Sequence, residues 1–240
     1  MTALLALDGI SKSFGALKVA DRLSLALESD EALGILGPNG AGKTTLFNLI
    51  SGDLQPDAGR VHLDGAEITA LAPHLRCRAG IGRSYQIPHP FTGMTVFENL
   101  LVAAVFGGGM GEAEASGVCI DILTRTGLAR RANQLAGSLT LLDRKRLELA
   151  RALATRPRVL LLDEIAGGLT EHEAHALVDT ILGIRAQGVA IVWIEHVVHA
   201  LLACVQRLVV LNFGALIAEG EPREVMASAE VQRVYMGIEV

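Results

Sequence analysis

The sequence predicts an α/β fold with a mainly parallel β-sheet and an inserted helical segment. Short apolar runs typical of buried strands alternate with longer stretches of helical periodicity. The runs Ala32–Leu36, 159–162 and Ala190–Ile194 contain no polar alternation, which indicates strands buried on both faces, as in a parallel sheet. Residues 95–154 are helical in pattern, so we expect a separate helical lobe within the α/β core.

The remaining elements follow from shorter patterns. Strands are predicted near residues 4–10, 23–27, 60–63 and 81–85, and helical spacing is seen over 42–50. Thr95 and Glu98 have the spacing of a capping box that opens a helix, and the glycines at 107–109 interrupt the helical segment. Residues 207–211 and 215–218 are predicted to form a hairpin, and the chain from Pro222 one or two short helices.

Composition excludes several classes of protein. Half of the 240 residues are apolar and 4% are aromatic, which suits a buried aliphatic core and excludes a disordered chain. The net charge is -5 with both signs interspersed, so nucleic acid is a poor candidate partner. No apolar run reaches the roughly 18 residues of a membrane span, and the three cysteines lack the spacing of a metal site. We expect a cytosolic chain.

A phosphate-binding loop is the strongest functional signal. Its sequence fits G-x-x-x-x-G-K-[ST], between an apolar strand and a helix, where backbone N–H groups and the helix N-terminus can cradle phosphates. The alternative, an ordinary glycine-rich turn, does not account for the Lys-Thr pair. Lys43 is expected to reach the β- and γ-phosphates, and the Thr44 hydroxyl to ligate Mg²⁺. The predicted ATP-binding residues here are Gly37, Pro38, Asn39, Gly40, Ala41, Gly42, Lys43, Thr44 and Thr45.

Two acidic residues follow the buried run at 159–162. Acids often end a strand for structural reasons alone, but their pairing with a phosphate loop favours a catalytic interpretation. Asp163 is expected to hold Mg²⁺ through water, and Glu164 to accept a proton from the attacking water.

Read together, these motifs resemble the ATP-binding subunits of ABC transporters along essentially the whole chain. The resemblance implies a P-loop NTPase fold of ABC type, with an antiparallel β subdomain and a helical subdomain. It divides this single ATP-binding domain into a core of residues 1–94 and 155–240 and a helical subdomain of about 95–154. It also implies ATP and Mg²⁺ as ligands.

Three further residues gain roles only from the resemblance. Phe14, in Ser13-Phe14-Gly15, matches an aromatic that stacks on adenine, whereas its residue type alone fits a core aromatic equally well. Gln86, which ends Ile81-Gly-Arg-Ser-Tyr-Gln86, matches a glutamine that approaches Mg²⁺ and the attacking water. His196 matches a histidine that contacts the γ-phosphate; without the resemblance it reads as a hydrogen-bonded residue at a strand end.

Within the family, the chain looks most similar to the ATPases of branched-chain amino acid importers. The similar stretches are residues 45–52, 86–91, 94–99 and 234–237. A related alternative is the ATPase of a lipopolysaccharide exporter. Alternatives from other classes are a nucleic-acid ABC ATPase, whose long coiled coils or cysteine-rich insertions this chain lacks, and a regulatory nucleotide binder without hydrolysis.

One stretch departs from the family. The signature Leu-Ser-Gly-Gly-Gln, which contacts the γ-phosphate on a facing subunit, is replaced here by Leu139, Thr140, Leu141, Leu142 and Asp143. Thr140 and Asp143 have the spacing of a helix capping box, and the leucines would hinder close approach to a phosphate. A second ATPase subunit with an intact signature is therefore expected, giving a heterodimer.

The resemblance also implies the setting. The ATPase would lie on the inner face of the cell membrane, bound to permease subunits and acting indirectly with a binding protein outside the membrane.

Overall fold

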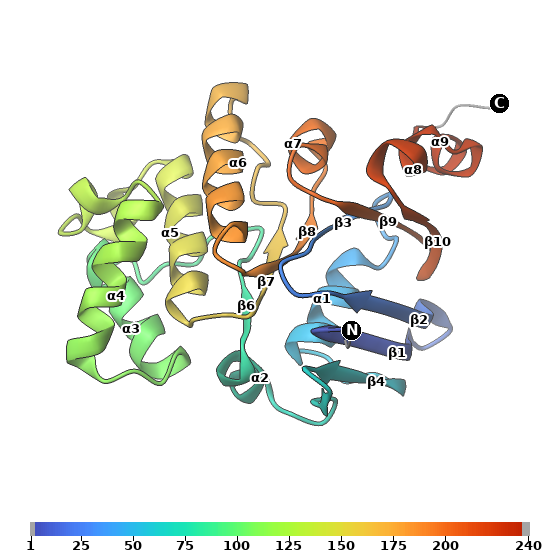
Figure 1. Cartoon of the computed structure of the whole chain (residues 1–240), viewed down its shortest axis with the longest axis horizontal. Coiled ribbons are helices and arrows are strands. Elements are labelled where there is room, and N and C mark those ends of the chain that lie inside the picture. The colour runs from blue at the N-terminus through green and yellow to red at the C-terminus, as the bar shows by residue number, and fades with distance from the viewer. Residues whose placement is uncertain (1–2, 237–240) are drawn as a thin grey trace.

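The computed structural model describes residues 3–236, which form two β-sheets and three groups of helices (Figure 1). The larger sheet has the strand order β10-β9-β3-β8-β7-β6. All its neighbouring pairs are parallel except the terminal hairpin of β9 and β10. Its strands are β3 (Ala32–Leu36), β6 (Ile81–Arg83), β7 (Val159–Asp163), β8 (Ala190–Ile194), β9 (Arg207–Asn212) and β10 (Ala215–Gly220).

The smaller sheet is antiparallel and has the order β2-β1-β4-β5. It consists of β1 (Leu5–Phe14), β2 (Leu17–Leu27), β4 (Ala58–Leu63) and β5 (Ala66–Glu67). β1 and β2 are longer than predicted, because their outer halves are polar and pair through bulges that obscure the apolar alternation. β6 is shorter than predicted: the Ser84 N–H still donates to the carbonyl of Leu161, but the chain then leaves the sheet.

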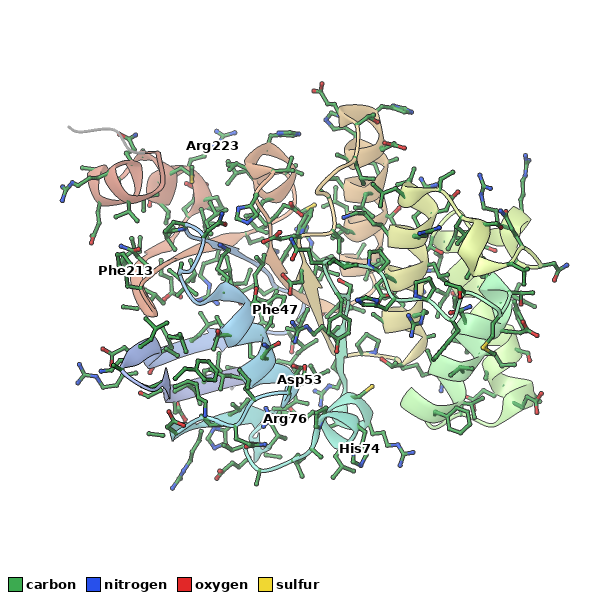
Figure 2. The ribbon with its side chains drawn as sticks, turned by 180° about the vertical axis from the view of Figure 1, so that it is seen from behind. Phe47, Asp53, His74, Arg76, Phe213 and Arg223 are labelled. Atoms are coloured by element: carbon green, nitrogen blue, oxygen red, sulfur yellow. The ribbon has the colours of Figure 1, made fainter. Side chains whose placement is uncertain are left out.

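Two apolar cores lie on opposite faces of the larger sheet. One core packs α1 (Lys43–Ser51) between the larger and smaller sheets, with Phe47 fully buried there (Figure 2). The other core packs the opposite face against α6 (Glu171–Arg185), α7 (Val198–Leu202), α8 (Pro222–Ala227) and α9 (Ala229–Met236). The predicted β9–β10 hairpin and the two short helices after Pro222 are confirmed. Gly237, the last residue of the stretch 234–237 that resembles importer ATPases, lies outside the described residues.

Three helices gather at one end of the molecule, away from the smaller sheet (Figure 1). They are α3 (Val96–Val102), α4 (Glu112–Arg125) and α5 (Leu141–Ala154). The Thr95–Glu98 capping box is confirmed with both of its hydrogen bonds, and a π-helical turn at Ala103–Gly107 leads into the predicted glycine interruption. Across residues 3–236, the helices are all too short or too polar to cross a bilayer.

The sequence did not predict α2 (Pro73–Ala79), a helix of seven residues. It is attached to the end of α1 by Arg76, whose side chain is fully buried. The guanidinium donates to the carbonyls of Leu49 and Ile50, and also to those of Thr69 and Leu71. A buried arginine held by backbone carbonyls has no local sequence pattern, which explains the omission.

Candidate nucleotide-binding and catalytic site

The predicted phosphate loop connects β3 to α1 and lines a cavity of about 280 Å³. Gly42 has φ 102°, and a Cβ at this position would lie 2.4 Å from the carbonyl oxygen of Val19. Only glycine can therefore make this turn. The cavity is lined by Leu17, Val19, Asn39, Gly40, Ala41, Gly42, Lys43, Thr44, Thr45 and Glu164. The loop residues Gly37 and Pro38 lie beneath this lining and contact Lys43 through their carbonyls.

Lys43 points its ammonium into the loop. Its Nζ donates to the carbonyl of Gly37 at 2.7 Å and to that of Pro38 at 3.0 Å. Burial lowers the pKa of Lys43, while the nearby carboxylates of Glu164 and Asp163 oppose this shift. The loop carbonyls thus hold a cation where an incoming phosphate could replace them as hydrogen-bond acceptors.

Glu164, His196 and Gln86 meet at the carboxyl ends of neighbouring strands. In the parallel pair β7 and β8, Asp163 lies opposite Ile194, so the residues that follow each strand share one edge of the sheet. Nε2 of His196 lies 2.7 Å from Oε1 of Glu164, and the Gln86 side-chain amide donates to Oε2. Because Glu164 also lines the cavity of the phosphate loop, its carboxylate is placed between that loop and two polar side chains.

Asp163 lies behind this group, almost fully buried at 4% exposure. Its carboxylate pairs with the Arg83 guanidinium at 3.2 Å. Burial raises the pKa of Asp163, and the positive charge of Arg83 opposes that shift. Arg83 also contacts Asn48 at 2.7 Å and Asp53 at 3.1 Å, so it links α1 to β6 and β7. Sequence reasoning did not identify Arg83, because these partners are far apart in the chain.

The predicted Mg²⁺ ligands are all oxygen donors, namely the Thr44 hydroxyl, the Gln86 amide oxygen and the Asp163 carboxylate. Mg²⁺ is usually held in proteins by one or two carboxylates together with substrate phosphates and water. Thr44 lies in the phosphate-loop cavity beside Glu164, and Gln86 contacts Glu164. The oxygen donor types therefore suit this ion, with Thr44 in the cavity and the Asp163 carboxylate held behind it by Arg83.

Phe14 lies at the end of β1 and is 51% exposed, so it is not a core aromatic. Nζ of Lys12 lies 5.8 Å from the centroid of its ring and is paired with Asp57 at 2.7 Å. Among the described residues, Leu17 and Val19 of β2 line the mouth of the phosphate-loop cavity. These two apolar side chains were not predicted, and adenine stacking by Phe14 stays a prediction.

The altered signature stretch forms the start of α5. The Thr140 hydroxyl accepts from the backbone N–H of Asp143 at 3.3 Å and donates to the Asp143 carboxylate at 2.9 Å. The helix-cap interpretation is thus confirmed, although the second bond differs from that of a capping box, in which the acid accepts from the Thr140 backbone. Asp143 is 4% exposed and pairs with Arg131 at 2.9 Å, whereas Leu141 is 49% exposed. Leu139 is buried in the core, and Leu142 is half-buried.

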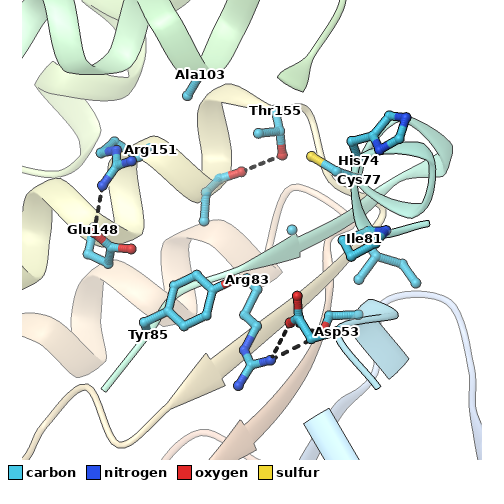
Figure 3. A pocket seen from close by; sticks show the side chains of 14 residues that line it. Asp53, His74, Cys77, Ile81, Arg83, Tyr85, Ala103, Glu148, Arg151 and Thr155 are labelled. Carbon is cyan, nitrogen blue, oxygen red and sulfur yellow. Dashed lines mark hydrogen bonds and ion pairs between the residues drawn. The ribbon is translucent and has the colours of Figure 1, made fainter. Parts of the chain in front are cut away.

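A second cavity, a groove of about 290 Å³, is lined by residues of α2, β6 and α5 (Figure 3). Its wall includes the Glu148–Arg151 ion pair, 3.0 Å long, together with Tyr85 and Arg83. Arg151 also donates to the His89 carbonyl and lies 5.2 Å from the Phe91 ring centroid. The groove therefore adjoins the exposed loop that follows Gln86, in which Ile87 is 65% and Phe91 46% exposed.

The sequence of this chain is similar to those of known ATP-binding proteins. The family model described as "ABC transporter" matches residues 20–167. The high-affinity branched-chain amino acid transport ATP-binding protein BraF of Pseudomonas aeruginosa is 36% identical, with 98% of each chain covered. LivG of Salmonella typhimurium, described in the same words, is 35% identical at the same coverage. The lipopolysaccharide export system ATP-binding protein LptB of Haemophilus influenzae is 32% identical, again over 98% of each.

The fold of this chain also superposes on solved structures of ATP-binding cassettes. The ADP conformation of an ATP-binding cassette of an ABC transporter superposes with a TM-score of 0.91 at 32% identity, covering 99% of this chain and 100% of that one. A nucleotide-free cassette gives a TM-score of 0.90 at 31% identity, with the same coverage. These matches confirm the predicted fold class and ATPase activity. The chain belongs to the ABC transporter family of ATP-binding domains and is an ATPase.

Proposed function

We propose that this chain powers an ABC importer for branched-chain or related amino acids. The support is the similarity to BraF and LivG along 98% of the chain. LptB, at 32% identity, supports the second candidate, an exporter ATPase of the lipopolysaccharide type. The cargo would be selected by the membrane permease and an external binding protein, with this subunit on the inner face of the membrane.

The observation that carries the catalytic proposal is the placement of Glu164 between the phosphate loop, His196 and Gln86. Lys43 and the loop N–H groups would bind the phosphates of ATP. Mg²⁺ held through Thr44 and Asp163 would neutralise phosphate charge. Glu164 would accept the proton of the attacking water, and His196 would orient the γ-phosphate. When two ATPase subunits close around ATP, the Gln86 loop and a helical subdomain of about residues 95–154 would transmit this movement to the membrane permease.

The permease is proposed to dock on the loop 86–91 and the adjoining groove of Figure 3. Exposed apolar side chains gather here, namely Tyr85, Ile87 and Phe91. The loop is also held in shape, because the buried Asn99 side chain accepts from the Phe91 N–H at 2.9 Å and donates to its carbonyl at 3.1 Å. A loop that is already fixed loses little conformational entropy when a partner protein binds, so it favours binding more than a mobile loop would.

The working dimer is proposed to be a heterodimer. The Thr140 hydroxyl is occupied by Asp143, and the exposed Leu141 stands where the family has glycine. A phosphate facing this stretch would meet an apolar side chain instead of N–H donors, and an unpaired charged acceptor costs about 1–3 kcal/mol. The partner subunit would supply an intact signature to this chain's own ATP.

Import is tested by co-purifying the chain with its permease and partner ATPase and placing the complex in liposomes. The external binding protein and labelled leucine, isoleucine and valine are then added. The proposal expects ATP-dependent uptake that disappears with Lys43→Ala. Uptake of none of these amino acids, together with ATP-dependent release of lipopolysaccharide from liposomes prepared with it, would replace the importer with the exporter.

A further inference from the structure

Glu164 has an unusual backbone conformation that its neighbours hold in place. Its φ is +47°, in the left-handed region that residues with a side chain rarely adopt. Such a conformation persists only where surrounding contacts fix it. The Glu164 N–H donates to the Ile194 carbonyl at 2.8 Å, and the Glu164 carbonyl accepts from Nζ of Lys145 at 3.2 Å. The peptide groups flanking its Cα are therefore held by two separate elements, β8 and α5.

A second buried group, Glu195, ties the neighbouring segments together. Its side chain is 1% exposed. One carboxylate oxygen accepts from the Ala166 N–H at 2.9 Å, and the other accepts from the His196 N–H at 3.1 Å. The segment that carries Glu164 and the segment that carries His196 are thus joined through one carboxylate.

Lys145 is the buried cation near this carboxylate. It is 5% exposed and comes from α5, five residues after Thr140. Burial lowers the pKa of Lys145, and the carboxylates of Glu195 and Glu164 oppose that shift. A buried ion with no opposite charge nearby is unfavourable, so these carboxylates favour the ionised form of Lys145, whose ammonium donates to the Glu164 carbonyl.

We propose that Lys145 and Glu195 are positioning residues that hold the Glu164 carboxylate against His196. The inference rests on the proposed catalytic role of Glu164. Since Lys145 belongs to the helix that begins at the altered signature, a shift of α5 would release the Glu164 carbonyl and disturb its left-handed backbone. Contact between this stretch and a second ATPase subunit would in this way change hydrolysis at the chain's own site.

The test compares Lys145→Met and Glu195→Gln with Arg130→Met and Glu230→Gln, which change exposed residues. ATP turnover is measured in the complex that co-purifies with the chain. Because displacement by about 1 Å can cost up to about 10²-fold in rate, we expect kcat to fall about 10- to 10²-fold in the first pair. KM for ATP should change by less than about twofold, since the phosphate loop is untouched. Lys145→Arg, which keeps the charge and a donor, should restore most of the rate.

A double-mutant comparison separates positioning from general structural damage. With Glu164→Gln already present, Lys145→Met should cause no further loss of single-turnover hydrolysis, because residues acting through one group are not additive. The proposal would be overturned if Lys145→Met lowered the hydrolysis rate by the same factor with and without Glu164→Gln. A rise in KM for ATP that parallels the fall in kcat, or no recovery of the rate with Lys145→Arg, would also overturn it. If Glu164→Gln itself leaves turnover intact, the role of Glu164 fails. If it stops turnover while Lys145→Met leaves kcat unchanged, only the positioning role fails.

Discussion

Nε2 of His196 lies 2.7 Å from Oε1 of Glu164, although the two residues follow different strands of the sheet. The contact exists because β7 and β8 run parallel in a register that places Asp163 beside Ile194. It fixes the orientation of the Glu164 carboxylate, and His196 is the side chain that the proposed function places beside the γ-phosphate.

His196→Ala should lower ATP turnover by about 10²-fold, in the range of lost acid–base and orienting groups. Nucleotide affinity should change little, because the phosphate loop and Lys43 are intact. His172→Ala, which alters an exposed histidine on α6, is the matched control. Steady-state kinetics and calorimetric titration with ATP measure the two quantities. Turnover at the level of the control would remove His196 from the mechanism.

Arg83→Met should lower the free energy of unfolding by about 3 kcal/mol, because the buried carboxylate of Asp163 loses its cation. Arg60→Met, at an exposed residue 3.9 Å from Glu67, should change it by less than about 1 kcal/mol. Urea unfolding of both variants gives the comparison. Adding ATP with Mg²⁺ should recover part of the loss, since the metal brings positive charge to Asp163. Equal stability of the two variants would show that the Arg83 pair contributes nothing.

Phe91→Asp should release the permease in a pull-down from membranes while ATP affinity of the isolated subunit stays unchanged. The introduced charge would face an apolar partner surface and would be costly to desolvate there. Ile120→Asp makes the same kind of change on α4, where the side chain is 60% exposed. Retention of permease by Phe91→Asp, or its loss with Ile120→Asp as well, would move the docking surface elsewhere.

Lys43→Ala in this chain should abolish transport, whereas the equivalent change in the partner ATPase should leave a measurable fraction. The reason is that this chain's nucleotide would face the partner's intact signature, while the partner's nucleotide would face Leu141. Uptake in liposomes containing each variant complex measures the difference. Equal loss in both complexes, or full activity of a homodimer, would contradict the asymmetric arrangement.

The sequence was most informative where one local pattern determines the structure. β3 and β8 have their predicted ends, because each is an apolar run buried on both faces. The phosphate loop was equally clear, since Gly42 must turn within contact distance of Val19. Arg83, Lys145 and Glu195 were not identified as site residues. Their positions depend on pairs of residues distant in the chain, and a lone charge in a sequence does not reveal a buried partner.

The role of Glu164 is tested most directly by Glu164→Gln in the assembled transporter. The variant loses the negative charge that accepts a proton but keeps the size of the side chain. We predict that turnover falls by about 10²-fold or more, while calorimetry shows ATP bound with unchanged affinity and radiolabelled ATP is converted to ADP more slowly by the same factor. Loss of binding in parallel with turnover, or turnover equal to that of the native chain, would contradict the assignment of Glu164 as the base.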